Sequence, residues 1–178
     1  MPVKLAENRY GKSKVRLMRV TKHEDHHDLD EWTVQVLLSG DFETAHTLGD
    51  NSQILPTDTM KNTVYSLARD SKATSMEDYA KELVDFLLGR NPQVTEAEVV
   101  VESTLWKRLT VDGKPFPTAF MRGSDEVQTT VVSRKCPRTL SKSMPAARPS
   151  SVYSHVAFSA VAKIRSVVSG SVVSSSLI

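Results

Sequence analysis

The sequence predicts an α+β fold in which two helices cover one face of an antiparallel sheet. Apolar and polar residues alternate in two N-terminal segments, apolar residues recur at helical spacing in two central segments, and alternation returns in the last two. The predicted order is therefore β-β-α-α-β-β. Two strand pairs on either side of two helices form one sheet with both helices on the same face.

The first two strands are predicted at residues 14–22 and 32–39. In the second strand, four apolar residues occupy alternate positions and share one face: Trp32, Val34, Val36 and Leu38. The charged segment between the strands, residues 23–30, predicts a turn.

The two helices are predicted at residues 59–68 and 75–88, where apolar residues recur every three or four positions. Ser75 is followed by two acidic residues in the first turn, as is typical of an N-cap. Gly89 stands where the second helix is expected to end.

The last two strands are predicted at residues 94–109 and 118–132. The dipeptide Asp112-Gly113 between them favours a tight hairpin turn, because both positions of such a turn need positive φ. The sheet is therefore expected to contain two hairpins, one before the helices and one after them.

The composition changes abruptly at Arg134. Residues 1–133 carry 16 of the 23 Lys and Arg and all 21 Asp and Glu, whereas residues 134–178 hold seven basic residues, no acidic residue and 12 Ser among 45 positions. The sequence predicts one domain over residues 1–133 and a separate basic, Ser-rich tail. That tail is either a basic arm for an anionic partner or an out-of-frame translation of a longer gene.

The out-of-frame interpretation of the tail is favoured, because aromatic and basic residues are not interleaved as in nucleic-acid-binding segments. We expect residues 156–168 to be disordered or to self-associate. No nucleic-acid partner is expected.

The sequence has no apolar run long enough for a secretory signal or a membrane span. Its single cysteine, Cys136, cannot form a disulfide within the chain, which favours a reducing compartment. We therefore expect a soluble intracellular protein with no membrane partner.

Residues 50–65, DNSQILPTDTMKNTVY, combine turn formers with a strand-to-helix boundary. Pro56 restricts the residue before it to extended geometry, which puts Thr57 or Asp58 at the expected N-cap of the next helix. The free amides of a helix N-terminus also bind anions. Taken alone, these residues are best interpreted as a cap, and a cap is compatible with anion binding.

Lys12 follows Gly11 just before the first predicted strand. Its ammonium group is expected at the sheet end where residues 50–58 arrive. A buried lysine beside a hydroxyl group can accept and relay a proton. On residue type alone, a solvated lysine at a strand end is the favoured interpretation.

Four segments form a set: Arg9-Tyr10-Gly11-Lys12, residues 50–65, Trp106-Lys107-Arg108 and Gly113-Lys114-Pro115. Together they resemble the urate oxidases (uricases) over residues 1–133. The resemblance implies a tunnelling-fold (T-fold) unit, two of which make up each subunit of a homotetramer in that family. It also implies a cytoplasmic location in a bacterium or a peroxisomal one in a eukaryote.

The activity implied by the resemblance is oxidation of urate by O2 to 5-hydroxyisourate and H2O2 in purine degradation, without a cofactor or metal. The resemblance assigns Lys12 and Thr57 to a catalytic proton relay. It assigns Thr57 and Asp58 to substrate binding, with Asp58 acting through its backbone amide. Urate is a planar monoanion at neutral pH, which suits a helix N-terminus.

The chain departs from the family pattern in two places. The family's purine-binding arginine and glutamine, its stacking phenylalanine, and the asparagine and histidine of its oxygen site have no match after residue 133, and His155 is not assigned to that role. Phe116-Pro117-Thr118 stands where uricases usually have His-Pro-His. We therefore expect a truncated chain that does not turn over urate alone.

Two alternatives remain open: a non-catalytic module that only associates with uricase subunits, and a zinc-dependent pterin or purine enzyme of the same fold. The second predicts a metal at five residues of the first turn: His23, Asp25, His26, His27 and Asp28. A solvated hairpin turn is favoured there, because the spacing matches no standard zinc pattern.

Two further residues are given no assigned role. His46 is interpreted as an ordinary histidine. Trp106 is interpreted equally well as a strand-end aromatic at an interface or as a contact residue.

Overall fold

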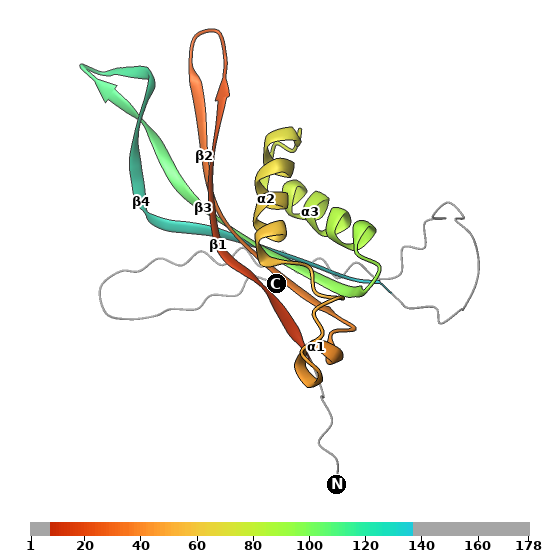
Figure 1. Ribbon diagram of the computed structural model, residues 1–178. Coiled ribbons are helices and arrows are strands. Elements are labelled where there is room, and N and C mark those ends of the chain that lie inside the picture. Colours follow the sequence, from red (N-terminus) through yellow and green to blue (C-terminus); the bar gives the residue numbers. More distant parts are fainter. Residues whose placement is uncertain (1–7, 137–178) are drawn as a thin grey trace, which may run out of the picture.

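The computed structural model describes residues 8–136 (Figure 1). The tail predictions for residues 137–178, including residues 156–168 and His155, lie outside this range. The elements of the described range are, in chain order, β1 (Arg9–Lys22), β2 (His27–Gly40), α1 (Glu43–Thr47), α2 (Thr57–Asp70), α3 (Met76–Arg90), β3 (Val94–Val111) and β4 (Lys114–Lys135).

The four strands form one antiparallel sheet in the order β1-β2-β3-β4. Helix α2 packs against β1, and α3 packs against β3 and β4, so both helices cover the same face of the sheet (Figure 1). The predicted α+β fold with two helices on one face is therefore confirmed.

The core lies between this sheet face and the two helices. Buried valines of β2 pair across the sheet with buried valines of β3, Val34 with Val101 and Val36 with Val99. Tyr79 of α3 is fully buried above them, and its ring centroid lies 5.1 Å from that of Trp32. The apolar face predicted for the second strand thus forms the sheet side of the core.

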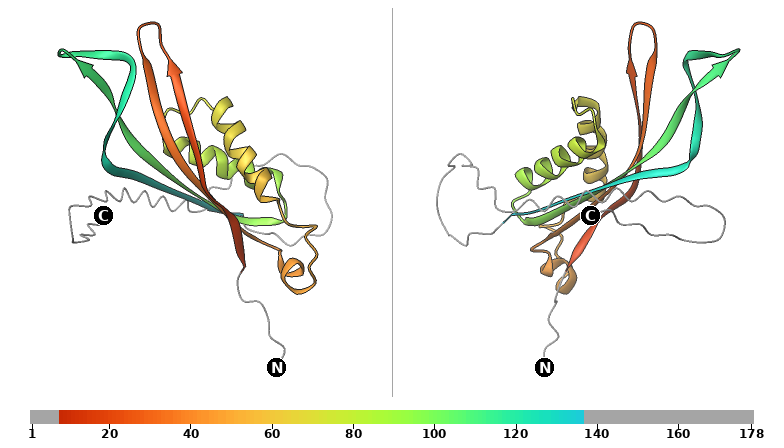
Figure 2. Two further views of the ribbon diagram at one scale, coloured as in Figure 1. Left: turned by 60° about the vertical axis from the view of Figure 1, so that its left-hand side comes forward. Right: turned by 180° about the vertical axis from the view of Figure 1, so that it is seen from behind.

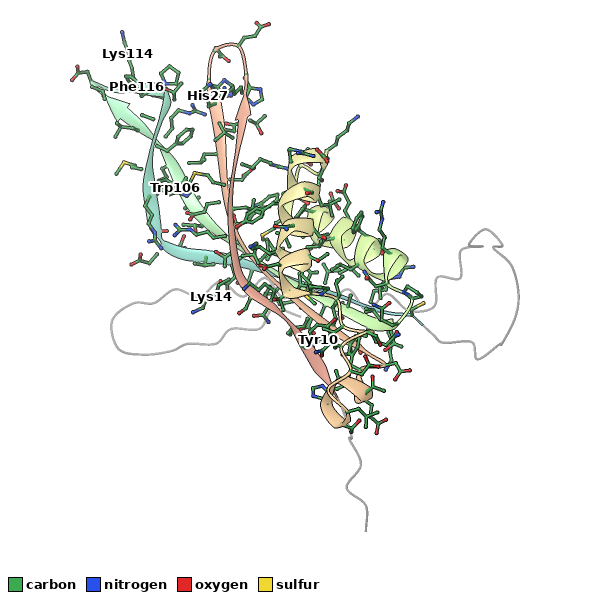
Figure 3. The ribbon with its side chains drawn as sticks, viewed as in Figure 1. Tyr10, Lys14, His27, Trp106, Lys114 and Phe116 are labelled. Carbon is green, nitrogen blue, oxygen red and sulfur yellow. The ribbon has the colours of Figure 1, made fainter. Side chains whose placement is uncertain are left out.

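The two hairpins extend past the helices and diverge from each other (Figure 2). The β3–β4 turn is Asp112-Gly113, with φ of 50° and 75°, as the sequence predicts. The β1–β2 turn contains His23 and His26 and lies at the end of its hairpin farthest from Tyr10 (Figure 3).

Several predicted boundaries are wrong. β1 begins at Arg9 rather than at residue 14, because the bulge after Lys12 interrupts the alternation without ending the pairing with β2. α3 continues through Gly89 to Arg90, where the Asn91 side chain binds the Leu87 carbonyl. Gly89 has open space around it and does not end the helix.

The structure also contains a helix, α1, that the sequence does not predict. α1 is a single short helix with no buried residue, so it has no apolar periodicity to detect. No helix among residues 8–136 is long and apolar enough to cross a membrane.

Candidate functional site

Lys12 lies within β1, beside a bulge in its pairing with β2. Lys12 pairs with Val36, and the register shifts before Val15 pairs with Val34. Within the bulge, Lys14 adopts a φ of 56°, and its side chain points away from the helices (Figure 3). Because directly paired residues share a sheet face, Lys12 is on the helix-covered side, with the buried Val36. The Lys12 side chain itself is half-buried.

Gly11 permits β1 and β2 to approach closely next to Lys12. A Cβ atom on Gly11 would lie 1.9 Å from the Val36 carbonyl oxygen and 2.8 Å from its carbon. These contacts are with backbone, so no side-chain rotation would relieve them. The glycine of the Tyr-Gly-Lys sequence is therefore required for the position of Lys12.

Tyr10 connects β1 to the loop that leads into α2. Its hydroxyl accepts a 2.7 Å hydrogen bond from the Leu55 amide and lies 3.4 Å from the Leu55 carbonyl oxygen, to which it donates. Its ring packs edge-on against Phe42, with 4.7 Å between the ring centroids. Burial raises the pKa of the Tyr10 hydroxyl, and the hydrogen bond with Leu55 partly offsets that effect. These contacts fix the position of Leu55, which lies two residues before Thr57 in the sequence.

Helix α2 begins directly after Pro56, whose extended backbone has φ −56° and ψ 139°. Pro56 occupies the N-cap position, so the prediction that Thr57 or Asp58 caps this helix is wrong, and no side chain caps it. Thr57 is the first helical residue, and both it and Asp58 are exposed. The first backbone amides of the helix have no partner within it.

Asp58, at the start of α2, interacts with two lysines. Its carboxylate accepts a 2.9 Å hydrogen bond from Lys61. That bond and the charge of Lys61 lower the pKa of the Asp58 carboxyl, and the charge of Lys12 adds to the effect. The structure therefore brings Lys12 close enough to the α2 N-terminus for their charges to interact.

Lys12 and Asp58 thus lie near enough for their charges to interact, where α2 packs against β1, and Thr57 adjoins Asp58 at the start of α2. The sequence does not reveal that Tyr10 joins β1 to the loop before α2, because hydrogen bonds between distant segments leave no periodic signal. A surface hollow of about 530 Å³ lies elsewhere, between the outer parts of the two hairpins, and is lined by Arg19, Trp106 and Arg108 among others. Neither Lys12 nor Thr57 lines it.

Trp106 contacts a buried carboxylate rather than projecting freely from its strand. Its Nε1–H donates a 2.8 Å hydrogen bond to Glu31 Oε2, and Arg16 pairs with the other carboxylate oxygen. Glu31 is 2% exposed. Trp106 therefore donates one of the hydrogen bonds that compensate for the burial of the Glu31 carboxylate.

The uricase family model matches residues 8–133 of the chain. The chain is 38% identical to the uricase of Arthrobacter globiformis over 130 residues, which is 73% of this chain and 41% of that protein. It is 39% identical to the uricase of Aspergillus flavus over 132 residues, which is 71% of this chain and 44% of that protein. The chain therefore matches less than half the length of these relatives.

Solved structures show the same relationship. The crystal structure of the A. globiformis uricase superposes on this chain with a TM-score of 0.70 at 35% sequence identity. The superposition covers 78% of this chain and 46% of the A. globiformis chain. A urate oxidase from Bacillus sp. TB-90 gives a TM-score of 0.64 at 20% identity, which supports the fold alone. By its sequence over residues 8–133 and by its fold, this chain belongs to the uricase family.

Proposed function

We propose that this chain supplies the proton-relay and anion-binding part of a urate oxidase site. The observation that supports the proposal is the proximity of Lys12 to Asp58 at the start of α2, close enough for their charges to interact. The Tyr10–Leu55 hydrogen bond joins the same strand to the loop before this helix. Lys12, Thr57 and Asp58 all lie within the segment that matches the uricase family.

The α2 N-terminus supplies attraction for an anion. The amides without an intrahelical partner and the positive end of the helix dipole lie at Thr57 and Asp58, which are both exposed. A urate monoanion bound there would lie near the Thr57 hydroxyl and within reach of the Lys12 ammonium. Charge and hydrogen bonding would then orient the purine.

In the proposed reaction, the Thr57 hydroxyl and Lys12 form the relay that takes a proton from bound urate. The electron-rich purine passes two electrons to O2, which takes up the relayed proton and a second proton from water and leaves as H2O2. A water molecule supplies the hydroxyl group of 5-hydroxyisourate. Urate, O2 and H2O thus give 5-hydroxyisourate and H2O2 without a metal or flavin.

The exposure of Thr57 and Asp58 indicates that further contacts must enclose a substrate here. We therefore propose that the site works only in a homo-oligomer that supplies the remaining purine and oxygen contacts. The intact chain alone is expected to leave urate unchanged.

The test uses the chain alone and a chimera in which residues 8–133 replace the matching part of the A. globiformis uricase. Urate absorbance and H2O2 are followed in air, and circular dichroism and light scattering check the fold and assembly. The chain alone should be inactive, and the chimera should oxidise urate. Lys12→Ala and Thr57→Ala should each lower kcat of the chimera by roughly 100-fold or more.

Lys22→Ala serves as the matched control, because Lys22 is exposed on the same strand at its far end. It should leave kcat within about twofold. A folded chimera that keeps full activity with Lys12→Ala would refute the proposed role of Lys12. Urate oxidation by the purified chain alone would refute its dependence on other subunits.

A non-catalytic association module is the second candidate. The observation that favours it is the set of exposed apolar side chains on the sheet face away from the helices, including Met18, Val20 and Val131. Co-expression with full-length A. globiformis uricase distinguishes the two candidates. A module would co-purify with that protein and give an inactive chimera, whereas the catalytic proposal requires an active one.

A further inference from the structure

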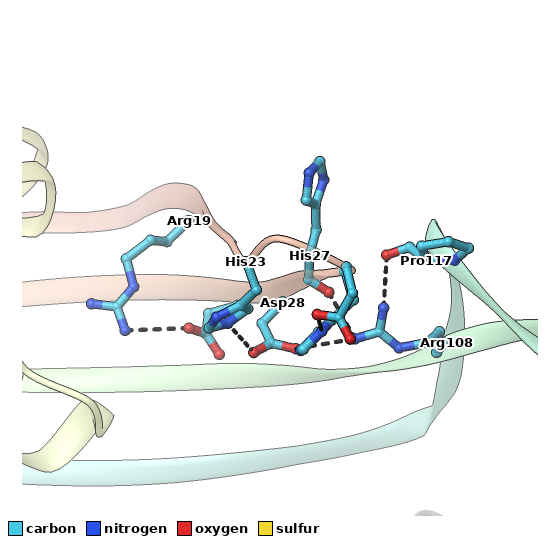
Figure 4. Close-up of polar contacts among 9 residues, drawn as sticks. Arg19, His23, His27, Asp28, Arg108 and Pro117 are labelled. Carbon is cyan, nitrogen blue, oxygen red and sulfur yellow. Dashed lines mark hydrogen bonds and ion pairs between the residues drawn. The ribbon is translucent and has the colours of Figure 1, made fainter.

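The β1–β2 turn brings together three side chains with metal-binding atoms. One ligand atom from each of His23, His26 and Asp28 lies within 4.8 Å of the other two. His23 Nε2 is 2.9 Å from Asp28 Oδ2, and His26 Nε2 is 3.8 Å from Asp28 Oδ1 (Figure 4). The two rings stack with centroids 4.5 Å apart. This turn lies at the opposite end of β1 from Lys12, so the inference is independent of the proposed function.

These separations fit a small metal ion. Zinc bonds of about 2.0–2.2 Å to nitrogen and oxygen place two tetrahedral ligands roughly 3.3–3.5 Å apart. His23 Nε2 lies 2.9 Å from Asp28 Oδ2, and His26 Nε2 lies 3.8 Å from the other carboxylate oxygen, Oδ1, so each histidine is near this separation from one oxygen of Asp28. One ligand atom of each residue lies within 4.8 Å of the others, and each side chain is 39–54% exposed, so side-chain rotation can bring the three to coordination distance.

Asp25 orients one of the two imidazoles. His26 Nδ1 lies 2.6 Å from Asp25 Oδ1, and because a carboxylate only accepts, Nδ1 carries the hydrogen. His26 Nε2 is then left with its lone pair directed toward the cluster. A carboxylate on the distal nitrogen of a histidine ligand is a common feature of zinc sites.

The backbone and β3 hold the turn in this shape. The His23 amide donates a 2.8 Å hydrogen bond to the His26 carbonyl. Arg108 of β3 donates to the His27 carbonyl at 2.7 Å and to Asp28 Oδ1 at 3.1 Å. Asp28 is thereby fixed near both histidines, while the Arg108 charge competes with a metal ion and moderates its affinity.

We propose that His23, His26 and Asp28 bind one divalent ion of the zinc class, with water completing its coordination. Two imidazoles and one carboxylate favour Zn²⁺, Ni²⁺ or Cu²⁺ over Mg²⁺ and Ca²⁺, which prefer oxygen ligands. His23 gives up its hydrogen bond to Asp28 and carries its hydrogen on Nδ1 in the bound form. The sequence identifies these residues as possible ligands, but their spacing matches no standard zinc pattern and favours a solvated turn. The proximity of the three side chains in the structure is what supports a metal site.

The test titrates Zn²⁺ into the intact metal-free chain by calorimetry in a buffer that does not bind zinc. One ion should bind per chain, and His23→Ala and His26→Ala should each weaken that binding at least tenfold. Asp25→Asn should weaken it by roughly 10-fold or more through loss of the oriented Nδ1–H bond. Far-UV circular dichroism confirms that each variant is folded.

His27→Ala is the matched control, because His27 is in the same segment but its ring points away from the cluster (Figure 4). It should bind Zn²⁺ like the unmodified chain. NMR of the histidine rings with added Ni²⁺ gives a second readout, in which the His23 and His26 signals should broaden before those of His27 and His46. Absence of zinc binding, or unchanged binding in the His23→Ala/His26→Ala double variant, would overturn the proposal.

Discussion

The Tyr10 hydroxyl and the Leu55 backbone are joined by two hydrogen bonds, one from the Leu55 amide at 2.7 Å and one to its carbonyl at 3.4 Å. These residues are 45 positions apart in the sequence. The first lies two residues before Lys12 and the second two residues before Thr57. The Tyr10 side chain therefore joins the strand that carries Lys12 to the loop that leads to Thr57.

Tyr10→Phe should destabilise the fold, because the ring remains against Phe42 while the half-buried Leu55 amide loses its acceptor. The expected decrease in the free energy of unfolding is about 1–3 kcal/mol. Urea denaturation followed by circular dichroism measures it.

Tyr65→Phe is the control for this prediction. Its hydroxyl also binds β1, donating to the Arg16 carbonyl at 3.1 Å, but that contact is exposed. Its loss should cost no more than about 0.5–1 kcal/mol. Equal effects of the two substitutions would show that the Tyr10 hydroxyl has no special structural role.

Gly11→Ala should be strongly destabilising, by roughly 3 kcal/mol, because its Cβ meets the Val36 backbone. Gly89→Ala is the opposite case, since Gly89 is helical and a Cβ atom there would extend into open space, with no packed neighbour within 4 Å. That substitution should stabilise the chain by about 0.5–1 kcal/mol. Thermal and urea unfolding of both variants check the opposite signs, and a neutral Gly11→Ala would contradict the close approach of β1 and β2.

Substitutions at Thr57 and Ser75 should distinguish a residue needed for activity from one needed for stability. The Ser75 side chain accepts a hydrogen bond from the Asp78 amide at 3.2 Å, so Ser75→Ala should cost about 1 kcal/mol as the loss of a cap. Thr57 is not a cap, and Thr57→Ala should change stability by less than about 0.5 kcal/mol. A large loss of stability for Thr57→Ala would show that it has a structural role, and the loss of chimera activity would then need another explanation.

The sequence predicts the fold well because its elements carry periodic signals. The alternation of Trp32, Val34, Val36 and Leu38 identifies a strand and its buried face, and Asp112-Gly113 identifies a turn. Ser75 is correctly predicted as a cap, because its signal is local. The bulge after Lys12 breaks the alternation, and so the start of β1 is predicted five residues too late.

The site is less predictable, because it depends on contacts between segments distant in sequence. Thr57 and Asp58 are predicted as site residues from their motif, but Pro56 takes the cap position. Neither the hydrogen bond between Leu55 and Tyr10 nor the one from Trp106 to the buried Glu31 can be recognised from residue type or spacing. Such contacts appear only once the strands are paired.

Tyr79 should make stability depend on pH in the alkaline range. It is fully buried, and its hydroxyl donates a 2.8 Å hydrogen bond to the Val64 carbonyl. Burial, with a smaller contribution from the charge of Glu82, raises the pKa of Tyr79 well above its ordinary value near 10. In the unfolded chain the hydroxyl ionises near that ordinary value.

Between the ordinary and the raised pKa of Tyr79, the folded state binds one more proton than the unfolded state. The stabilising contribution is therefore complete below about pH 10 and decreases as the pH rises, by up to about 1.4 kcal/mol per pH unit. Tyr79→Phe should remove this part of the slope, whereas exposed Tyr65→Phe should keep it. Urea unfolding between about pH 8 and pH 11.5 measures the difference. If Tyr79→Phe and the unmodified chain lose stability in parallel over this range, Tyr79 is not the group that links folding to alkaline pH.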